Sequence, residues 1–173
     1  MPASRSNPTV LVVTPEVTYL PEGMGNMSNH LTAKAGGLAD VSAALISALF
    51  DQGADVHVAL PDYREIFAAH TAPVLKSEFR RIRDKMPNER IHLAEDRAFF
   101  YTTTVYSHYG SDNIKIALAF QREIINNIMP RVKPDLIHCN DWMTGLIPAM
   151  ARQRGIPCLF TVHNIHTVKT TLS

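Results

Sequence analysis

Apolar residues along the chain fall into two patterns, short continuous runs and longer runs spaced by three and four residues. Thr9–Thr14 is a continuous run of mostly β-branched residues, which predicts a buried strand. In Leu38–Gln52 the apolar residues recur at helical spacing, and Gly53 follows as a helix stop. Asp55–Leu60 is a second strand-like run, which Pro61 ends. This part of the chain therefore predicts a strand, a helix and a strand.

The last part of the chain repeats this alternation. Ser111–Met129 begins with a potential capping residue and has the apolar spacing of a helix of four or five turns. Asp135–Cys139 then predicts a strand, Thr144–Arg154 a helix that stops at Gly155, and Pro157–Val162 the next strand. Alternating strands and helices indicate a doubly wound, mainly parallel, Rossmann-like α/β sheet.

The middle of the chain has a weaker pattern. Pro73–Phe79 and Arg90–Leu93 predict short strands, and the charged run Arg80–Lys85 between them predicts a solvated loop. The β-branched and aromatic residues of Phe99–Tyr106 favour a further strand.

Polar or glycine-rich segments follow three of the predicted strands. They are Pro15–Gly37, Asn140–Trp142 and His163–Asn164. In an open parallel sheet, ligands bind beyond the carboxyl ends of the strands. We therefore expect these three segments to meet at one edge of the sheet and to form a ligand site there.

The segment Lys34-Ala35-Gly36-Gly37 lies directly before the first predicted helix. Adjacent glycines let backbone N–H groups approach an anion, a helix N-terminus adds unpaired N–H donors, and Lys34 adds a positive charge. These parts suit a phosphate or diphosphate. The segment is neither a Walker loop nor a dinucleotide-binding fingerprint. Its local chemistry fits a structural turn with a surface lysine equally well.

Three side chains after the later strands carry the remaining candidate chemistry. Asp141 can cap the following helix or accept hydrogen bonds from sugar hydroxyls. Trp142 can pack in the core or form a wall of a ligand cleft. His163, which Asn164 follows, can be a packing residue or a hydrogen-bond donor to a ligand. The spacing alone leaves each of these alternatives open.

Composition narrows the classes of function. The chain has 173 residues, of which 46% are hydrophobic and 19% charged, as in an ordinary soluble domain. A formal net charge of +1 gives no reason to expect nucleic acid or a membrane as partner. Cys139 and Cys158 lie in or beside apolar runs and are expected to be small buried thiols, with no metal site or disulfide. The polar first residues do not form a signal peptide, so we expect a cytoplasmic protein.

Four blocks of the sequence occur in the same order in one protein family. They are Val12-Val13-Thr14-Pro15-Glu16, Lys34-Ala35-Gly36-Gly37-Leu38-Ala39-Asp40-Val41, Pro134-Asp135-Leu136-Ile137-His138-Cys139-Asn140-Asp141-Trp142 and Phe160-Thr161-Val162-His163-Asn164. On these blocks the chain resembles the N-terminal domain of bacterial glycogen synthases and plant-type starch synthases. The Lys-x-Gly-Gly-Leu block is the most specific motif of that family, and the resemblance covers nearly the whole chain.

The resemblance implies a retaining glucosyltransferase that transfers glucose from ADP-glucose to the non-reducing end of an α-1,4-glucan. It implies no metal or other cofactor, and a GT-B architecture with the active site between two Rossmann-like domains. By similarity, Lys34 contacts the donor diphosphate, and Gly36 and Gly37 let the backbone approach the same phosphates. Asp141 and His163 are the expected catalytic residues, close to the transferred glucose.

Other positions are assigned less closely by the resemblance. Trp142 and Asn164 are expected behind the residues that touch the substrate. Asp40 is expected there too, or as a support of the helix, with ligand contact an equal alternative. Asn140 and Met143 stand where family members commonly have histidine, which puts the polar contacts of those side chains in doubt.

The length of the chain and of one loop also depart from the family. Thr18–Thr32 is longer than expected and is either a flap over the acceptor side or a tolerated insertion. Residues 1–173 are expected to be part of the N-terminal domain, without the C-terminal nucleotide-binding domain, and inactive alone. Two alternatives stay open: another donor, such as UDP-glucose, and a non-catalytic glucan-binding domain.

Overall fold

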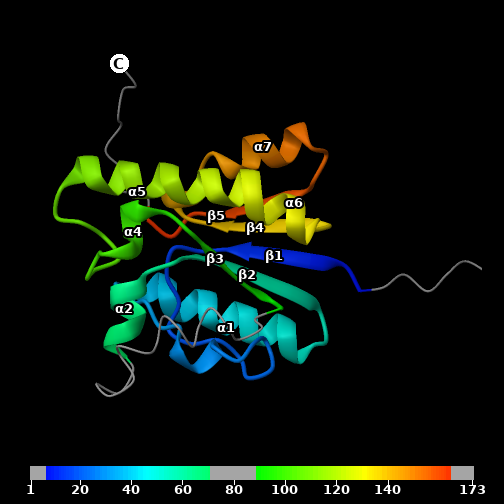
Figure 1. Cartoon of the computed structure of the whole chain (residues 1–173). Coiled ribbons are helices and arrows are strands. Elements are labelled where there is room, and N and C mark those ends of the chain that lie inside the picture. The colour runs from blue at the N-terminus through cyan, green and yellow to red at the C-terminus, as the bar shows by residue number, and fades with distance from the viewer. Residues whose placement is uncertain (1–6, 71–88, 165–173) are drawn as a thin grey trace, which may run out of the picture.

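The computed structural model describes residues 7–70 and 89–164, which form one α/β unit (Figure 1). Its centre is a sheet of five parallel strands in the order β3-β2-β1-β4-β5. The predicted parallel sheet is therefore confirmed. The strands are β1 (Thr9–Val13), β2 (Asp55–Pro61), β3 (Ile91–Ala94), β4 (Leu136–Asn140) and β5 (Cys158–Thr161).

Strand β1 lies at the middle of the sheet because its side chains are apolar on both faces. Leu11, Val12 and Val13 are fully buried, with helices on either side. The chain runs outward from β1 through β2 to β3 and then returns to the other side of β1 with β4. This reversal creates a switch point between the carboxyl ends of β1 and β4, where open α/β sheets bind ligands.

Helices cover both faces of the sheet, as a doubly wound fold requires (Figure 1). One face carries α1 (Gly37–Asp51) and α2 (Arg64–Ala69). The other carries α5 (Gly110–Glu123), α6 (Met129–Val132) and α7 (Ile147–Gln153). The remaining turns of helix are α4 (Arg97–Phe100), 3-10 turns at Ser28–His30 and Trp142–Thr144, and a π-helical segment at Ile124–Ile128.

The strand predicted at Phe99–Tyr106 is wrong. Helix α4 occupies its beginning, and the Asp96 side chain caps that helix by accepting a hydrogen bond from Ala98 N at 2.8 Å. Phe99 is fully buried, and its ring meets that of Tyr63 edge to face at 6.1 Å between centroids. The aromatic residues thus serve an aromatic cluster, and local composition alone could not separate that role from a strand.

The predicted helices are broadly confirmed, with different ends. Ser111–Met129 forms α5 and the π-helical segment, and the helix continues through α6. Thr144–Arg154 starts later than predicted, because the 3-10 turn at Trp142–Thr144 comes first and α7 follows. Helix α2 was not predicted. The expectations for Pro73–Phe79 and Arg80–Lys85 lie outside the described residues.

The loop Thr18–Thr32 is packed against the domain rather than poised over the site. Its apolar side chains, Leu20, Met24, Met27 and Leu31, are at most 3% exposed. Met24 O accepts a hydrogen bond from Arg90 N, directly before β3, and Gly23 lies against the Phe50 ring near the end of α1. The loop therefore runs toward the amino ends of the strands, so the flap interpretation is wrong.

The two cysteines are neighbours across β4 and β5. Cys139 is buried as predicted, whereas Cys158 is only half-buried, and both are free thiols with their Sγ atoms 3.7 Å apart. Strand β5 also exposes Leu159 and Phe160, by 55% and 37%. Within the described residues, no helix is long and apolar enough to span a membrane.

Candidate functional site

A cleft of about 460 Å³ opens at the switch point between β1 and β4. Its volume is in the range of small-molecule sites. It unites the three segments that were predicted to meet at this edge. The lining residues are Glu16, Ala35, Gly36, Gly37, Leu38, Tyr106, Asn113, Asp141, Trp142, His163 and Asn164.

The glycine-rich loop is held by Glu16, which lies three residues after the end of β1. Glu16 Oε2 accepts hydrogen bonds from Ala35 N at 2.6 Å and Gly36 N at 3.0 Å. Glu16 Oε1 accepts one from the Tyr106 hydroxyl at 3.0 Å. The N–H of Gly36, which the family resemblance assigned to a phosphate, therefore already has an internal carboxylate as partner.

The two glycines nevertheless leave the space that an anion would need. A Cβ atom at Gly36 or Gly37 would meet nothing within 4 Å, so no neighbouring side chain requires glycine there. Gly37 begins α1, and no side chain caps the helix N-terminus. The first backbone N–H groups of a helix have no intrahelical partner. The N–H groups of Gly37 and Leu38 are thus the donors suited to an anion in the cleft.

Lys34 is paired with Asp40 and does not line the cleft. Its Nζ donates to both carboxylate oxygens, at 2.9 and 2.8 Å, and Thr18 Oγ1 donates to the same carboxylate at 2.6 Å. The hydrogen bond from Lys34 lowers the pKa of Asp40. About half of each side chain is exposed, so this ion pair is weak and Lys34 is free to exchange partners.

Asp141 has a strained backbone at the carboxyl end of β4. Its φ of 63° and ψ of −179° belong to a region that is essentially reserved for glycine. Its N–H donates to Thr161 O, and its carbonyl accepts from Thr144, which fixes this geometry. Its carboxylate makes no hydrogen bond within residues 7–70 and 89–164 and does not cap the next helix. The capping alternative is therefore wrong.

His163 is oriented by Asn140, one of the two positions at which the sequence departs from its family. Asn140 is 1% exposed, and its Nδ2 donates to Val13 O at 3.4 Å. Its Oδ1 must then accept the 3.0 Å hydrogen bond from His163 Nε2. This arrangement leaves Nδ1 of His163 available to a ligand. The substituted position thus makes a polar contact of its own.

Two aromatic residues form the remaining wall. The Tyr106 and Trp142 rings lie 6.5 Å apart between centroids, and Trp142 is 36% exposed. Burial and the adjacent Glu16 carboxylate raise the pKa of Tyr106 far above its usual value. Because Trp142 lines the cleft and is partly exposed, it forms a wall of the cleft and is not a residue of the core.

Sequence reasoning missed Glu16 and Tyr106 as residues of the cleft. Glu16 lies two residues after the first predicted strand, in one of the four matching blocks, and this position could have marked it. Tyr106 carried no such signal, because its segment resembles a strand. Across the described ranges there is no cluster of three or more His, Cys, Asp or Glu side chains that could hold a metal.

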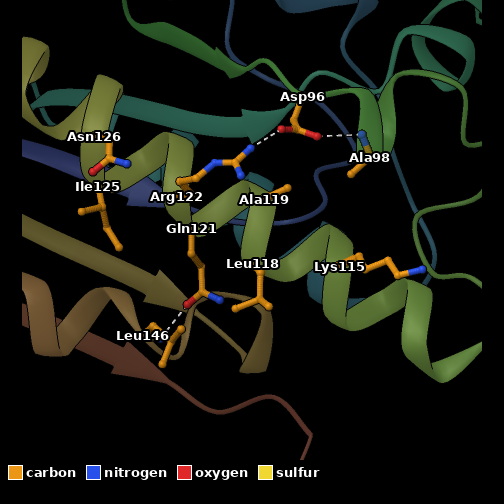
Figure 2. A pocket seen from close by; sticks show the side chains of 10 residues that line it. All are labelled: Asp96, Ala98, Lys115, Leu118, Ala119, Gln121, Arg122, Ile125, Asn126 and Leu146. Atoms are coloured by element: carbon orange, nitrogen blue, oxygen red, sulfur yellow. Dashed lines mark hydrogen bonds and ion pairs between the residues drawn. The ribbon is translucent and has the colours of Figure 1, made fainter. Parts of the chain in front are cut away.

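A second cavity, of about 620 Å³, lies along helix α5 (Figure 2). Arg122 points toward Asp96 and pairs with it, and Gln121 Oε1 accepts a hydrogen bond from Leu146 N at 2.6 Å. Its walls are otherwise mainly apolar, with Leu118 and Ile125 among them. Asp96 and Arg122 already pair with one another, and Gln121 already bonds to backbone groups, so the cavity offers less polar chemistry than the cleft.

Comparison with known proteins identifies the family of the chain. Residues 9–171 match the model of one protein family, described as the starch synthase catalytic domain. The chain belongs to this family. It is 32% identical over 176 residues to glycogen synthase from Moorella thermoacetica. The matched region covers 90% of this chain and 33% of that protein. It is 31% identical to glycogen synthase from Exiguobacterium sibiricum, over 76% of this chain and 32% of that protein.

The fold agrees with that of the family. The catalytic domain of starch synthase IV from Arabidopsis thaliana, bound to ADP and acarbose, matches 92% of this chain with a TM-score of 0.58 and 20% identity. The match covers 34% of that structure. The chain thus spans about a third of the length of its relatives in the starch synthase catalytic domain family.

Proposed function

We propose that the protein carrying these residues is a retaining glucosyltransferase that uses ADP-glucose to extend an α-1,4-glucan at its non-reducing end. One observation carries the proposal. The cleft brings the glycine-rich loop, from one side of β1, together with Asp141 and His163, from the other side. An anion site and sugar-binding side chains therefore share one cavity in a chain of the starch synthase catalytic domain family.

The anion side suits the leaving group of this reaction. When glucose leaves the donor, negative charge builds on the diphosphate. Fixed N–H groups at the start of α1 stabilise that charge without reorganisation. Lys34 adds its charge by exchanging Asp40 for the phosphates, a small movement for an exposed side chain.

The sugar side suits a glucosyl group. The Asp141 carboxylate faces the cleft without a hydrogen-bond partner in the described part of the chain, and Nδ1 of His163 is available beside it. The Asp141 carboxylate and His163 Nδ1 accept hydrogen bonds from sugar hydroxyls. They hold the sugar ring while its anomeric carbon gains oxocarbenium character. We expect no metal, because the N–H groups at the start of α1 and Lys34 can stabilise the charge on the leaving diphosphate.

Replacement of Lys34 tests the anion role. In the full-length protein, K34A should lower kcat/KM for ADP-glucose about a hundredfold and leave the KM of the glucan unchanged. Initial rates with ADP-glucose and with UDP-glucose measure this and identify the preferred donor. K115A removes an exposed lysine of α5 and is the matched control.

Three outcomes would contradict the proposal. An unchanged donor KM and kcat in K34A would remove the phosphate role of Lys34. Preference for UDP-glucose would replace the donor. Glucan binding without glucosyl transfer by the full-length protein would favour a non-catalytic domain.

A further inference from the structure

The Glu16 carboxylate lines the cleft, yet both of its oxygens are engaged within the protein. It accepts hydrogen bonds from Ala35 N, Gly36 N and the Tyr106 hydroxyl, and the residue is 2% exposed. Hydrogen bonds from N–H groups to a carboxylate are among the strong ones in proteins. Glu16 therefore binds the glycine-rich loop rather than waiting for a ligand.

The backbone of Glu16 is fixed as well. Thr14 Oγ1 donates to Glu16 O at 2.9 Å and is bonded to Ser42 Oγ of helix α1 at the same distance. Val17 and Ala33 form an antiparallel bridge with two N–H···O bonds of 2.9 Å. The bridge joins the residue after Glu16 to the residue before Lys34, where the glycine-rich loop begins. Contacts on both neighbouring segments thus fix the position of Glu16.

The hydrogen bonds to Glu16 determine which N–H groups of the loop can face a ligand. Those of Ala35 and Gly36 turn toward Glu16, whereas those of Gly37 and Leu38 start α1 without a side-chain cap. Without the carboxylate, the first two donors would lose their partner, which is unfavourable for partly buried N–H groups. The loop would then turn to satisfy them and would change the direction of the next two.

A donor diphosphate that took all four N–H groups would have to displace Glu16. The displaced carboxylate would then remain in the same cleft as the diphosphate, and two like charges in a site of low dielectric repel strongly. The hydrogen bonds to the loop spread the charge of Glu16 over fixed donors. Glu16 therefore stays bound while the donor uses the start of α1.

We propose that Glu16 is a positioning residue of the donor site, holding the N–H groups of Ala35 and Gly36 inward so that those of Gly37 and Leu38 meet the donor phosphates. This inference rests on the proposed function. It concerns the placement of the loop, and Glu16 itself touches neither the donor nor the glucan.

Two variants of the full-length protein test this role. E16A should raise the KM of ADP-glucose about tenfold and leave the KM of the glucan within about twofold of its original value. E16Q keeps an oxygen that accepts from the two N–H groups, so its donor KM should lie between those of E16A and the original protein. E22A removes an exposed glutamate of the preceding loop and is the matched control.

Hydrogen exchange supplies a readout that is independent of activity. In E16A, the peptide covering residues 33–38 should exchange its amide hydrogens faster, while peptides of β1 and β4 keep their rates. E16Q should show a smaller increase. If E16A does not fold, E16Q alone still tests the proposal through its exchange rate and its donor KM.

The outcomes separate this inference from the proposed function. Faster exchange with an unchanged donor KM in E16A, when K34A does raise that KM, would overturn the positioning role alone. A raised glucan KM in E16A would also overturn it, because Glu16 would then act on the acceptor. If neither K34A nor E16A changes the donor KM or kcat, the proposed function fails and the positioning role with it.

Discussion

At the scale of single residues, Asp141 combines a strained backbone with a position in the lining of the cleft. A non-glycine residue in its backbone region costs on the order of 1–3 kcal/mol. The cost persists because hydrogen bonds from its own N–H and to its own carbonyl over-determine the geometry. The strained backbone places the carboxylate at the cleft, so the role that we propose for Asp141 would come at a cost in stability.

Substitution of Asp141 should reveal this competition. We expect D141G to be more stable than D141A by about 1–2 kcal/mol, because glycine adopts the same φ and ψ without strain. Both variants should lose transferase activity. Urea denaturation of the two variants measures the difference.

Asp112 provides the matched control in an ordinary helical position. It lies in the first turn of α5, where D112G should be less stable than D112A by up to about 1 kcal/mol. The same sign of difference at both positions would show that Asp141 is not strained.

At the scale of the secondary-structure elements, β2 and β3 are joined by a pair of histidines. His57 Nδ1 and His92 Nε2 share a hydrogen bond of 2.9 Å, and the rings are stacked with 5.2 Å between centroids. Burial lowers the pKa of His92 to about 4, with smaller contributions from His57 and Arg131. Burial also lowers the pKa of His57, against the attraction of Asp55.

This pair should make the protein less stable in mild acid. In the unfolded chain a histidine binds its proton near pH 6.5, but folded His92 does so only near pH 4. The unfolded state therefore binds more protons between these values, and the free energy of unfolding falls as the pH decreases from 6.5 to 4. The loss from His92 is at most about 3 kcal/mol.

Urea denaturation at pH 7.5 and pH 5 measures the effect. H92Q, which cannot take up the proton, should lose less stability between the two values than the original protein does. H108Q, at an exposed histidine, should behave like the original protein. An equal loss in H92Q would assign the acid sensitivity to other groups.

The elements show how far the sequence alone could lead. The apolar run of β1 and the helix–strand alternation after residue 110 predict the parallel sheet, because burial on both faces imposes those patterns. The segment around Phe99 fails because its aromatic residues pack on Tyr63 from a helix. The hydrogen bond between Gly36 N and Glu16 Oε2 joins residues 20 positions apart. It depends on the path of the loop between them, which no local sequence pattern predicts.

The candidate site was predictable to the same degree. Asp141 and His163 follow strands, and topology alone brings them to one edge. The side-chain pairs of the site could not be predicted in this way. Asn140 bonds to His163, and Lys34 bonds to Asp40, because of how the side chains pack. Residue types at the edge can be read from a sequence, whereas the hydrogen bonds among them require the packed structure.

At the scale of the whole molecule, the chain spans about a third of the length of its relatives. The function that we propose asks the described residues to bind only the phosphates and the transferred sugar of the donor. We therefore expect residues 1–173 alone to have no measurable transferase activity. Incubation of the purified fragment with ADP-glucose and a glucan, next to the full-length protein, measures this, and detectable elongation by the fragment would contradict it.

The pairing of β1 with β4 also has a consequence for how the protein folds. Thr9 N bonds to the Asp135 side chain across 126 positions of sequence, whereas β1 pairs with β2 across only 46. Closing the longer loop costs more chain entropy and slows folding. During synthesis, β1, α1 and β2 can assemble early, but both walls of the cleft exist only after β4 and β5 have been made. The cleft therefore forms late in the folding of this unit, although the glycine-rich loop is synthesised before β2, β3, β4 and β5.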